Sequence, residues 1–251
     1  LLHFAYDPVY NRLGVTPKYM AGIEMQQYLL SSGYTESDVA EVVVRNKARA
    51  IGNPLAPYGN NIELRDVLGS RPIATPLTEQ MAARPADGAV VIVLGSSDVA
   101  LETARKPVHL SGTGWCSGNS VLERRDHATS EGTAIAAQMA YSAAGIVDPD
   151  KELDVAYVSD LYAYRELMHL DALQFTDETL AKTNPDGGSL AGGDLIEANG
   201  GARFFDAVRQ LRGEAGAHQI EGAKRAVVQG WRGLPTDSCA VVVLDSERRT
   251  S

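Results

Sequence analysis

The loop from Asn184 to Gly201, NPDGGSLAGGDLIEANGG, holds six glycines and three carboxylates in eighteen residues and precedes a helical pattern. A phosphate-binding P-loop, GxxxxGK(S/T), requires Lys and then Ser or Thr directly after its second glycine. Counted from Gly187, that second glycine is Gly192, and Gly193 and Asp194 occupy the two positions that follow. The spacing therefore excludes a P-loop site for nucleoside triphosphates. Because two glycines directly precede Asp194, the sequence favours a functional carboxylate there over a simple helix cap.

A second polar junction, VSDLY at residues 158–162, follows a short apolar run and precedes another helical pattern. In α/β folds, functional groups gather where strands end, because free N–H groups at helix N-termini stabilise anions and developing oxyanions. The sequence leaves two interpretations of Asp160 open, a functional carboxylate or a helix cap. Gly200, Gly201 and Ala202 indicate close helix packing rather than ligand contact.

The other candidate motifs are weak. SGTGWCSG, residues 111–118, follows an expected strand, but its glycines are spaced one residue too widely for the dinucleotide-binding GxGxxG. Cys116 lies in this expected loop with no recognisable base nearby, and Cys239 begins an apolar strand, where burial explains it better. Neither cysteine has metal-ligand spacing, so no metal site is predicted.

The histidines never pair at i,i+4 or share a motif. Each is interpreted as a surface residue or a core residue whose hydrogen bonds are satisfied. The five are His3, His109, His127, His169 and His218.

Composition limits the class of protein. The chain has 251 residues, of which 44% are hydrophobic and 22% charged, as in a globular α/β protein. No apolar run is long enough to span a membrane, and a net charge of −9 argues against a nucleic-acid surface. Two cysteines make no disulfide framework, so a reducing cytoplasm is the expected compartment. The start, LLHFAYDPVY, lacks Met and a targeting pattern and indicates an entry in mid-protein.

The first part of the chain is predicted to be helical. Residues 18–50 carry two helical patterns broken at SSGYTESD, where Thr35 and Ser37 are candidate N-caps. Residues 53–61 contain two prolines and predict a loop. The run GAVVIVL, residues 88–94, predicts a strand covered on both faces, followed by a helix over SSDVALETA.

Alternating strands and helices are predicted for the remainder. PVHLSG predicts a strand, and residues 129–145 predict a helix with Thr129 or Ser130 as N-cap and Gly145 at its end. A strand is expected before Ser159, and a helix after the glycine-rich loop, stopping near Gly213. Two closing strands, AKRAVVQGW and SCAVVVLDS, are joined by RGLPTD. The apolar faces assigned to the two helices are Ile135, Met139, Ala140 and Ala143, and Ala202, Phe205, Val208 and Leu211.

The order of these segments resembles the thiolase superfamily, specifically the branch of sterol-carrier-protein-x-like thiolases. The resemblance covers nearly the whole chain. It includes YMAGIEMQQYLLSSGYTESDVAEVVVRNKARAIGNPLAPYG, RPADGAVVIVLGSSDVA, AAQMAYSAAGI, VSDLYAYRELMHLDAL, the glycine-rich loop and QLRGEAGAHQIEGAKRAVVQGWRGLPTDSCAVVVL. It implies a layered αβαβα thiolase-like fold, with residues 1–75 linking the two thiolase halves and residues 76–251 forming the C-terminal domain. The family's N-terminal half, which carries the cysteine that becomes acylated, has no counterpart in this sequence.

The sequence departs from the family pattern at its imidazoles. The family's Gly-His-Pro element falls on Gly193, Asp194 and Leu195, so an aspartate stands where the catalytic histidine is expected. In the branch's His-Asp-x-Phe element, Ser159 takes the place of His, with Asp160 and Tyr162 following. The late acid/base cysteine falls near Trp231, and Cys239 lies too far along to take that role.

The resemblance implies a subunit that cleaves a carbon–carbon bond in a bulky 3-oxoacyl-CoA, with coenzyme A as substrate and no permanently bound cofactor. Asp194 and Ser159 are the candidate catalytic residues. The residues expected to shape the substrate and oxyanion pocket are Gly192, Gly193, Asn199, Asp160 and Tyr162. A homodimer and a small OB-fold zinc-ribbon partner are expected. Two alternatives stay open: retro-aldol cleavage of a 3-hydroxyacyl-CoA, and a non-catalytic subunit that supports a catalytic partner.

Overall fold

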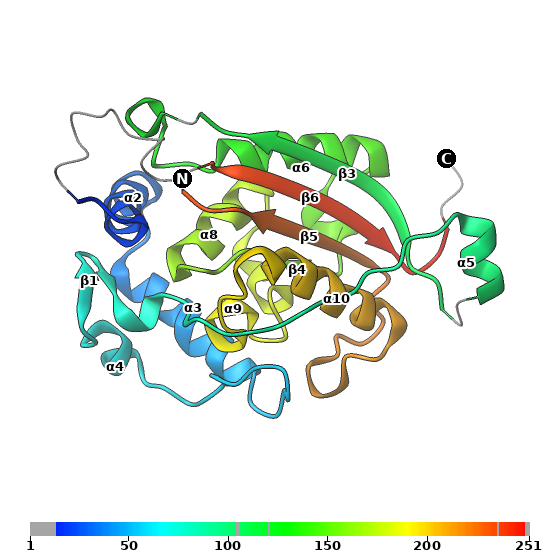
Figure 1. The fold of residues 1–251 in the computed structure, drawn as a ribbon, viewed down its shortest axis with the longest axis horizontal. Helices are drawn as coiled ribbons and strands as arrows, with labels where there is room; N and C mark the ends of the chain where they lie inside the picture. The colour runs from blue at the N-terminus through cyan, green and yellow to red at the C-terminus, as the bar shows by residue number, and fades with distance from the viewer. Residues whose placement is uncertain (1–13, 104–105, 120, 235, 249–251) are drawn as a thin grey trace.

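The computed structural model describes residues 14–103, 106–119, 121–234 and 236–248, so His3 and Arg249 lie outside the described residues. Figure 1 shows a curved sheet of four strands in the order β3-β6-β5-β4, with helices on both faces. β4 (Val155–Tyr157) runs parallel to β5 (Arg225–Trp231). β6 (Ser238–Asp245) is antiparallel to β5 and to β3 (His109–Ser117). The mixed sheet confirms the α/β class and the predicted closing pair of strands.

Alternate residues of β4, β5 and β6 face opposite helices, as the period of two in a strand requires. Ala156, Val227 and Val243 share one core with α6 (Glu131–Ala144) and α8 (Ala163–Ala172). On the other face, the core contains Val155, Tyr157, Ala226, Leu244 and residues of α10 (Asn199–Arg212). Burial on both faces explains why these strands are continuously apolar.

Strand β3 is longer than predicted and includes the GTGWCS stretch that the sequence had placed in a loop. Its glycines allow α6 to approach: a Cβ added at Gly112 would lie 2.1 Å from the carbonyl oxygen of Ala140, and one at Gly114 would lie 2.0 Å from that of Ala136. The glycine spacing therefore serves backbone packing, and Cys116 lies in a strand.

The same close packing corrects the predicted face of α6. The helix begins after Ser130 and ends at Gly145, as predicted, but Ile135 and Met139 are 41% and 40% exposed. The buried face consists of small residues and one tyrosine, because large side chains would hold the helix away from the β3 glycines. Its buried hydrophobic residues are Ala136, Ala137, Ala140 and Tyr141.

Two helices, α2 (Pro17–Ser32) and α3 (Glu36–Arg49), form the predicted helical region. Thr35 is the N-cap of α3 in a capping box with Asp38. Both helices pack with α8 in one hydrophobic core, so the first part of the chain shares its interior with the domain that follows. Short elements complete this region and the loops: α4 (Leu64–Leu68), β1 (Pro72–Ala74), β2 (Leu77–Thr78), α5 (Ser97–Thr103), α7 (Pro149–Glu152) and α9 (Gly188–Gly192).

The prediction of a buried strand at residues 88–94 is wrong for the described structure. This segment has no regular hydrogen-bonded structure and crosses α10 on its way to α5 (Figure 1). Val91 and Val93 are 86% and 90% exposed. A strand requires a hydrogen-bonded neighbouring strand, and no described strand pairs with residues 88–94. The helix predicted after it is present as α5.

The described helices include none with the length and apolar character needed to cross a membrane.

Candidate active site

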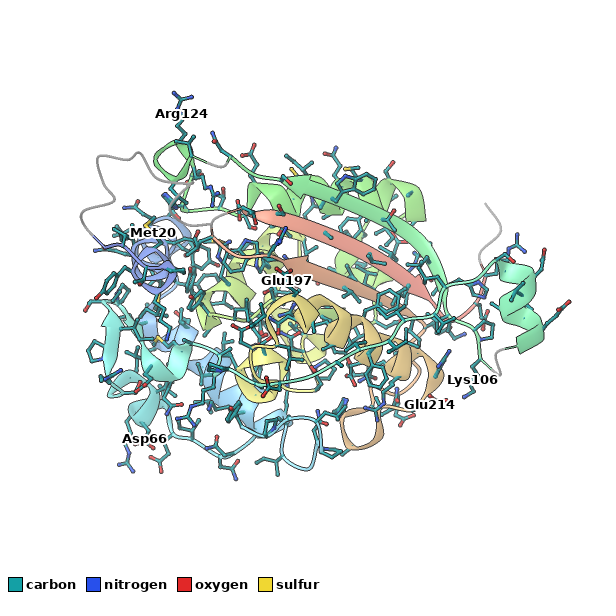
Figure 2. All side chains as sticks on the ribbon, viewed as in Figure 1. Met20, Asp66, Lys106, Arg124, Glu197 and Glu214 are labelled. Atoms are coloured by element: carbon teal, nitrogen blue, oxygen red, sulfur yellow. The ribbon has the colours of Figure 1, made fainter. Side chains whose placement is uncertain are left out.

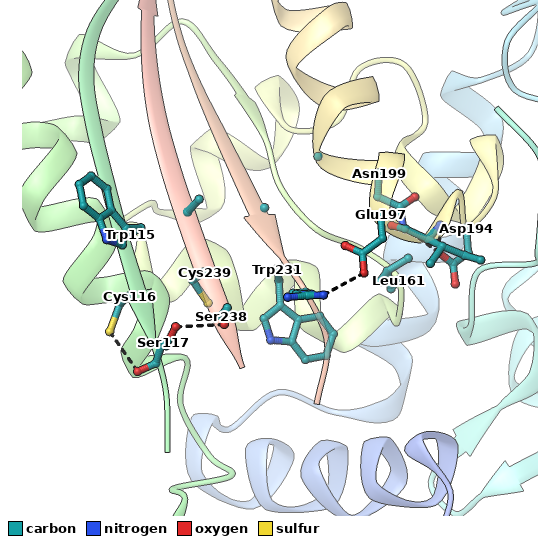
Figure 3. A pocket seen from close by; sticks show the side chains of 15 residues that line it. Trp115, Cys116, Ser117, Leu161, Asp194, Glu197, Asn199, Trp231, Ser238 and Cys239 are labelled. Atoms are coloured by element: carbon teal, nitrogen blue, oxygen red, sulfur yellow. Dashed lines mark hydrogen bonds and ion pairs between the residues drawn. The ribbon is translucent and has the colours of Figure 1, made fainter. Parts of the chain in front are cut away.

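Two cavities adjoin at the loop before α10, and Asn199 lines both. The first, of about 490 Å³, lies at the ends of β3, β5 and β6 and is lined by Asp194, Glu197, Trp231 and Cys239, among others. The second, of about 360 Å³, is lined by residues 86–91, by Gly193 and Leu195, and by α10. Figure 3 shows the first cavity, with Asp194 and Asn199 on one side, Cys116 and Cys239 on the other, and Trp231 between them. Figure 2 shows Glu197 near the end of β5, where it pairs with Arg232.

Asp194 is half-buried, and its carboxylate has a fixed orientation. Its Oδ1 accepts hydrogen bonds from Nδ2 of Asn199 at 2.7 Å and from the backbone N–H of Ile196 at 2.9 Å. Its backbone N–H donates to the carbonyl of Arg84 at 2.7 Å, and its carbonyl accepts from Ala86 N–H at 3.1 Å. Both side-chain hydrogen bonds from the described residues reach Oδ1, so Oδ2 is the oxygen available for proton transfer.

Gly193 places Asp194 through a backbone conformation that only glycine adopts readily. Its φ is +97° and its ψ is 166°. A Cβ added there would also lie 2.4 Å from the Cβ of Ala86. At Gly192, by contrast, an added Cβ would meet its nearest atom at 4.0 Å. Of the two glycines before Asp194, the second is therefore the one the loop requires.

Asn199 begins α10 and holds the loop closed. Its Oδ1 accepts from Leu195 N–H at 2.9 Å, and its Nδ2 donates to the Ile196 carbonyl at 2.9 Å as well as to Asp194. The amide therefore connects the backbone of Leu195 and Ile196 to the carboxylate of Asp194. Asn199 acts here as a positioning residue for Asp194.

Ser159, the second predicted catalytic residue, lies behind the cavities instead of on their walls. It is fully buried; its N–H donates to Oε1 of Gln229 at 2.9 Å, and its Oγ accepts from Nη2 of Arg203 at 3.3 Å. Gln229 donates in turn to Oγ1 of Thr133, which donates to Sγ of Cys239 at 3.4 Å. Ser159 therefore reaches the first cavity only through a chain of buried hydrogen bonds.

Asp160 is also fully buried and accepts hydrogen bonds from the first turn of α9. The backbone N–H groups of Ser189 and Leu190 donate to its two carboxylate oxygens at 2.7 and 3.1 Å, and Nδ2 of Asn46 donates at 3.2 Å. It stabilises the start of a helix distant in sequence, α9, and not the helix α8 that follows it. This contact ties VSDLY to the glycine-rich loop.

Tyr162 is half-buried and stacks on Tyr164, with ring centroids 6.1 Å apart. Burial, and then the nearby charges of Asp194 and Glu24, raise the pKa of Tyr162 to about 12. The phenol is therefore protonated at neutral pH and can donate a hydrogen bond. It is close enough to Asp194 for the charge of that carboxylate to act on it.

Trp231 is held in the first cavity by an ion pair behind it. The guanidinium of Arg165 lies 4.0 Å from the centroid of the indole ring and pairs with Glu24. The indole N–H donates to Asp237 at 2.7 Å. Cys239, on the same cavity wall, is buried as predicted, and this burial raises the pKa of its thiol to about 12. Cys239 is therefore a weak nucleophile at neutral pH.

His169 differs from the prediction of a satisfied core histidine. Its Nδ1 lies 3.2 Å from Oγ1 of Thr133, but its buried Nε2 has no hydrogen-bond partner among the described residues. Burial and the charges of Arg165 and Arg203 hold the pKa of His169 well below its ordinary value, so the ring is neutral. None of the described residues lining either cavity is a histidine.

Sequence reasoning missed the polar groups buried beneath the two cavities, chiefly Arg203 and Gln229. One signal was present on α10, where Asn199, Arg203, Asp206 and Gln210 recur at helical spacing and are all buried. The apolar positions of that helix predict a different inner face, which includes Phe205, yet Phe205 is 41% exposed. Among the described residues, no cluster of His, Cys, Asp or Glu has the geometry to hold a metal ion.

The family model described as "Thiolase C-terminal domain-like" matches residues 114–245, just over half of the chain. The chain belongs to the thiolase family. The thiolase chain is similar to benzoylsuccinyl-CoA thiolase subunit BbsB of Thauera aromatica, with 27% identity over 85% of this chain and 59% of that protein. It therefore spans less than two thirds of the curated relative's length.

Two solved structures share the thiolase-like fold. The structure titled "Ltp2-ChsH2(DUF35) aldolase" superposes with a TM-score of 0.79 and 22% identity, covering 93% of this chain and 64% of the other. A monomeric SCP2-thiolase-like protein type 1 from Mycobacterium smegmatis gives a TM-score of 0.73 and 19% identity, covering 94% and 53%. These neighbours confirm the thiolase-like fold that the sequence resembles.

Proposed function

We propose that this chain is the substrate-binding, C-terminal part of an enzyme that cleaves a carbon–carbon bond in a bulky 3-oxoacyl-CoA, with Asp194 as the acid–base group. The observation that carries the proposal is the oriented carboxylate of Asp194 in the first cavity. General acid–base catalysis requires a group held within reach of the substrate proton, and a half-buried carboxylate with one oxygen free satisfies this requirement. Similarity to a thiolase that acts on a CoA thioester supports the substrate class.

In thiolysis, a thiolate attacks C3 of the 3-oxoacyl-CoA and the C2–C3 bond breaks. Its electron pair forms a thioester enolate that takes a proton at C2. We assign that proton transfer to Asp194. The raised pKa of Cys239 makes it a poor source of the thiolate. The nucleophile is then free CoA or a cysteine outside this chain.

A retro-aldol reaction is the second candidate function. A carboxylate base removes the proton of a 3-hydroxyl group, the C2–C3 bond breaks, and an aldehyde or ketone leaves; the remaining thioester enolate takes that proton back at C2. This reaction needs no thiolate, and a carboxylate beside a thiolate would be electrostatically unfavourable. Two observations favour it: the described lining of the first cavity has no histidine, and a structural neighbour is titled an aldolase.

The test compares wild type with Asp194→Ala and Asp194→Asn in the full-length gene product, together with any subunit that copurifies. Matched 3-oxo- and 3-hydroxyacyl-CoAs are assayed with and without free CoA. We expect kcat to fall by roughly 10²- to 10⁴-fold in both variants, as for loss of a general acid or base. Asp66→Asn, an exposed carboxylate on α4, is the matched control.

The outcomes separate the candidates. Cleavage of the 3-oxo substrate that depends on free CoA supports thiolysis, and cleavage of the 3-hydroxy substrate without CoA supports the aldolase. Unchanged turnover in Asp194→Ala contradicts the role of Asp194. Binding of acyl-CoA without turnover in any condition would instead support the non-catalytic subunit.

The assembly is also part of the proposal. We infer a small OB-fold zinc-ribbon partner and a homodimer of the thiolase-like chain; the supporting observations are that the relative is named a subunit and the aldolase title joins two components. Native mass spectrometry of the purified complex checks both. A lone monomer that turns over substrate at the full rate would contradict them.

A further inference from the structure

The second cavity combines an apolar lining with one buried cation. Its walls include Leu55, Pro57, Val90, Leu195 and Phe205, and its volume of about 360 Å³ is in the range of small-molecule sites. Arg203 also lines it. A cation in an apolar cavity is costly unless something accepts its hydrogen bonds.

Arg203 has more hydrogen-bond donors than the described residues satisfy. Its side chain is 4% exposed, and Nη2 donates to Oγ of Ser189 at 2.9 Å and of Ser159 at 3.3 Å. Its Nε and Nη1 are buried without a hydrogen-bond partner among the described residues. An unsatisfied buried donor costs about 1–3 kcal/mol, and more when it is charged. An oxygen acceptor on a molecule in the cavity would therefore satisfy the hydrogen bonds of these two nitrogens.

The charges around Arg203 decide which kind of acceptor is suitable. Oδ1 of Asp160 lies 3.8 Å from Nη2, and the charge of Asp194 also acts on the guanidinium, as does that of Asp186 once it ionises near pH 7. Asp206, a further carboxylate, lines the cavity beside Asp186. The cation is thus already balanced, and an anionic ligand would be repelled by these carboxylates. An uncharged oxygen accepts the same hydrogen bonds without that repulsion.

We propose that the second cavity binds the distal part of the substrate's acyl group, an apolar body carrying one uncharged oxygen acceptor, and that Arg203 recognises that oxygen. The inference rests on the proposed acyl-CoA chemistry, because Asn199 lines both cavities and joins this one to the cavity of Asp194. The ligand class is a CoA thioester whose acyl chain bears a keto or hydroxyl group away from the thioester. Arg203 determines specificity in this assignment and takes no part in bond cleavage.

The experiment measures binding directly, so that it does not depend on turnover. The full-length Asp194→Ala protein is titrated by calorimetry with three 3-oxoacyl-CoAs of equal chain length, whose distal end is a methyl, a methyl ketone or a carboxylate. One hydrogen bond to a charged donor predicts that the ketone binds roughly tenfold more tightly than the methyl compound. The carboxylate is expected to bind no more tightly than the methyl compound.

The matched variant is Arg203→Lys, which keeps the charge beside Asp160 but removes the guanidinium nitrogens. The preference for the ketone should disappear, while affinity for the methyl compound stays the same. Arg212→Lys, the same substitution on α10 and outside both cavity linings, should keep the preference. Circular dichroism checks that both variants fold.

A second variant tests the cavity without disturbing the buried charge. Ala202→Leu, on the cavity wall and half-buried, should weaken binding of all three long thioesters and leave acetoacetyl-CoA unchanged. Equal affinity for the ketone and methyl compounds, or a preference that survives in Arg203→Lys, overturns the role of Arg203. Tightest binding of the carboxylate overturns the uncharged acceptor. If the wild type turns over no substrate but the ketone preference is present, the proposed reaction fails while the binding site stands.

Discussion

The two cavities share Asn199 but hold their polar groups in different ways. In the first, Asp194 lies half-buried on a loop, and two hydrogen bonds orient one of its carboxylate oxygens. In the second, Arg203 extends from a regular helix, is almost fully buried, and keeps two nitrogens without partners among the described residues. An oriented carboxylate suits proton transfer, whereas a buried cation with free donors suits recognition. In the proposed function, this difference corresponds to reactivity on the loop and specificity on the helix.

Gly193 lines the second cavity and directly precedes Asp194 of the first, so its replacement should have the largest effect. Gly193→Ala strains a residue with φ of +97° and sets its Cβ 2.4 Å from that of Ala86. We expect a loss of about 1–3 kcal/mol in stability and loss of most activity, because Asp194 moves with the loop. Thermal unfolding and a turnover assay measure the two effects.

Gly192→Ala is the matched control for stability. A Cβ at this position meets no atom closer than 4.0 Å, and Gly192 is the last residue of α9, where alanine is tolerated. Its Tm should stay close to that of wild type. Equal destabilisation by the two substitutions would show that the backbone of Gly193 is not what positions Asp194.

The next largest effect is expected from replacing Asn199. We expect a larger effect on catalysis in the first cavity than on binding in the second. Asn199→Ala removes the donor to Oδ1 of Asp194 and the acceptor for Leu195 N–H. We expect kcat to fall roughly 10- to 100-fold with a small change in KM, because the reactive group loses its orientation while the binding walls remain. A larger change in KM than in kcat would contradict a positioning role.

Asn199→Asp separates positioning from simple structural support. Its carboxylate still accepts from Leu195 N–H, but it faces the carboxylate of Asp194 at hydrogen-bond distance. Two carboxylates so close favour retention of a proton, so the acid limb of the pH–rate profile should move to higher pH. A profile identical in shape to that of wild type would mean that Asp194 does not titrate in the reaction.

The sequence draws attention to Asp194 but not to Arg203, for a physical reason. Asp194 is marked by the glycines before it, and their conformational demands are visible in the sequence. Arg203 has no such signal in the residues next to it in the sequence. Its partners are distant in the sequence: Ser159 follows β4, and Ser189 lies in α9. Buried polar networks of this kind depend on tertiary packing, which short patterns do not encode.

The fold shows the same division between local and distant determinants. The closing pair β5 and β6, and the ends of α6 and α10, follow from apolar periodicity and terminal glycines and were predicted. The run at residues 88–94 has the composition of a strand but no described partner, and composition alone cannot supply one. Gly112 and Gly114 were misassigned because their neighbour, α6, comes later in the chain.

A smaller effect is expected from Asp186, which lines the second cavity. Burial, and then the charges of Asp206 and Asp160, raise the pKa of Asp186 to about 7, while His218 opposes the shift. The folded state therefore favours the neutral acid, and this stabilisation is present below the unfolded pKa of about 3.9 and is lost as pH rises towards 7. Asp186→Asn removes the penalty of the buried charge and can still accept from Gly188 N–H.

The measurement is the Tm difference between Asp186→Asn and wild type across pH. We expect the variant's relative Tm to rise between about pH 4 and pH 7 by a few degrees, and then to level off. His218, whose pKa is raised by its bond to Asp206, titrates in both proteins and largely cancels in the difference. A difference independent of pH would show that Asp186 is ionised throughout this range.

The smallest effect should come from Glu197, at the rim of the first cavity. Its carboxylate lies 3.3 Å from Nη2 of Arg232, and the two side chains are 71% and 54% exposed. Exposed pairs of this kind contribute about 0.2–1 kcal/mol at most, and salt screens them. Glu197→Gln should leave Tm and kcat almost unchanged, even though Glu197 is close in sequence to Asp194. A large loss of kcat, measured at both low and high salt, would mean that a second carboxylate of this loop takes part in the chemistry, and the assignment of reactivity to Asp194 alone would have to be given up.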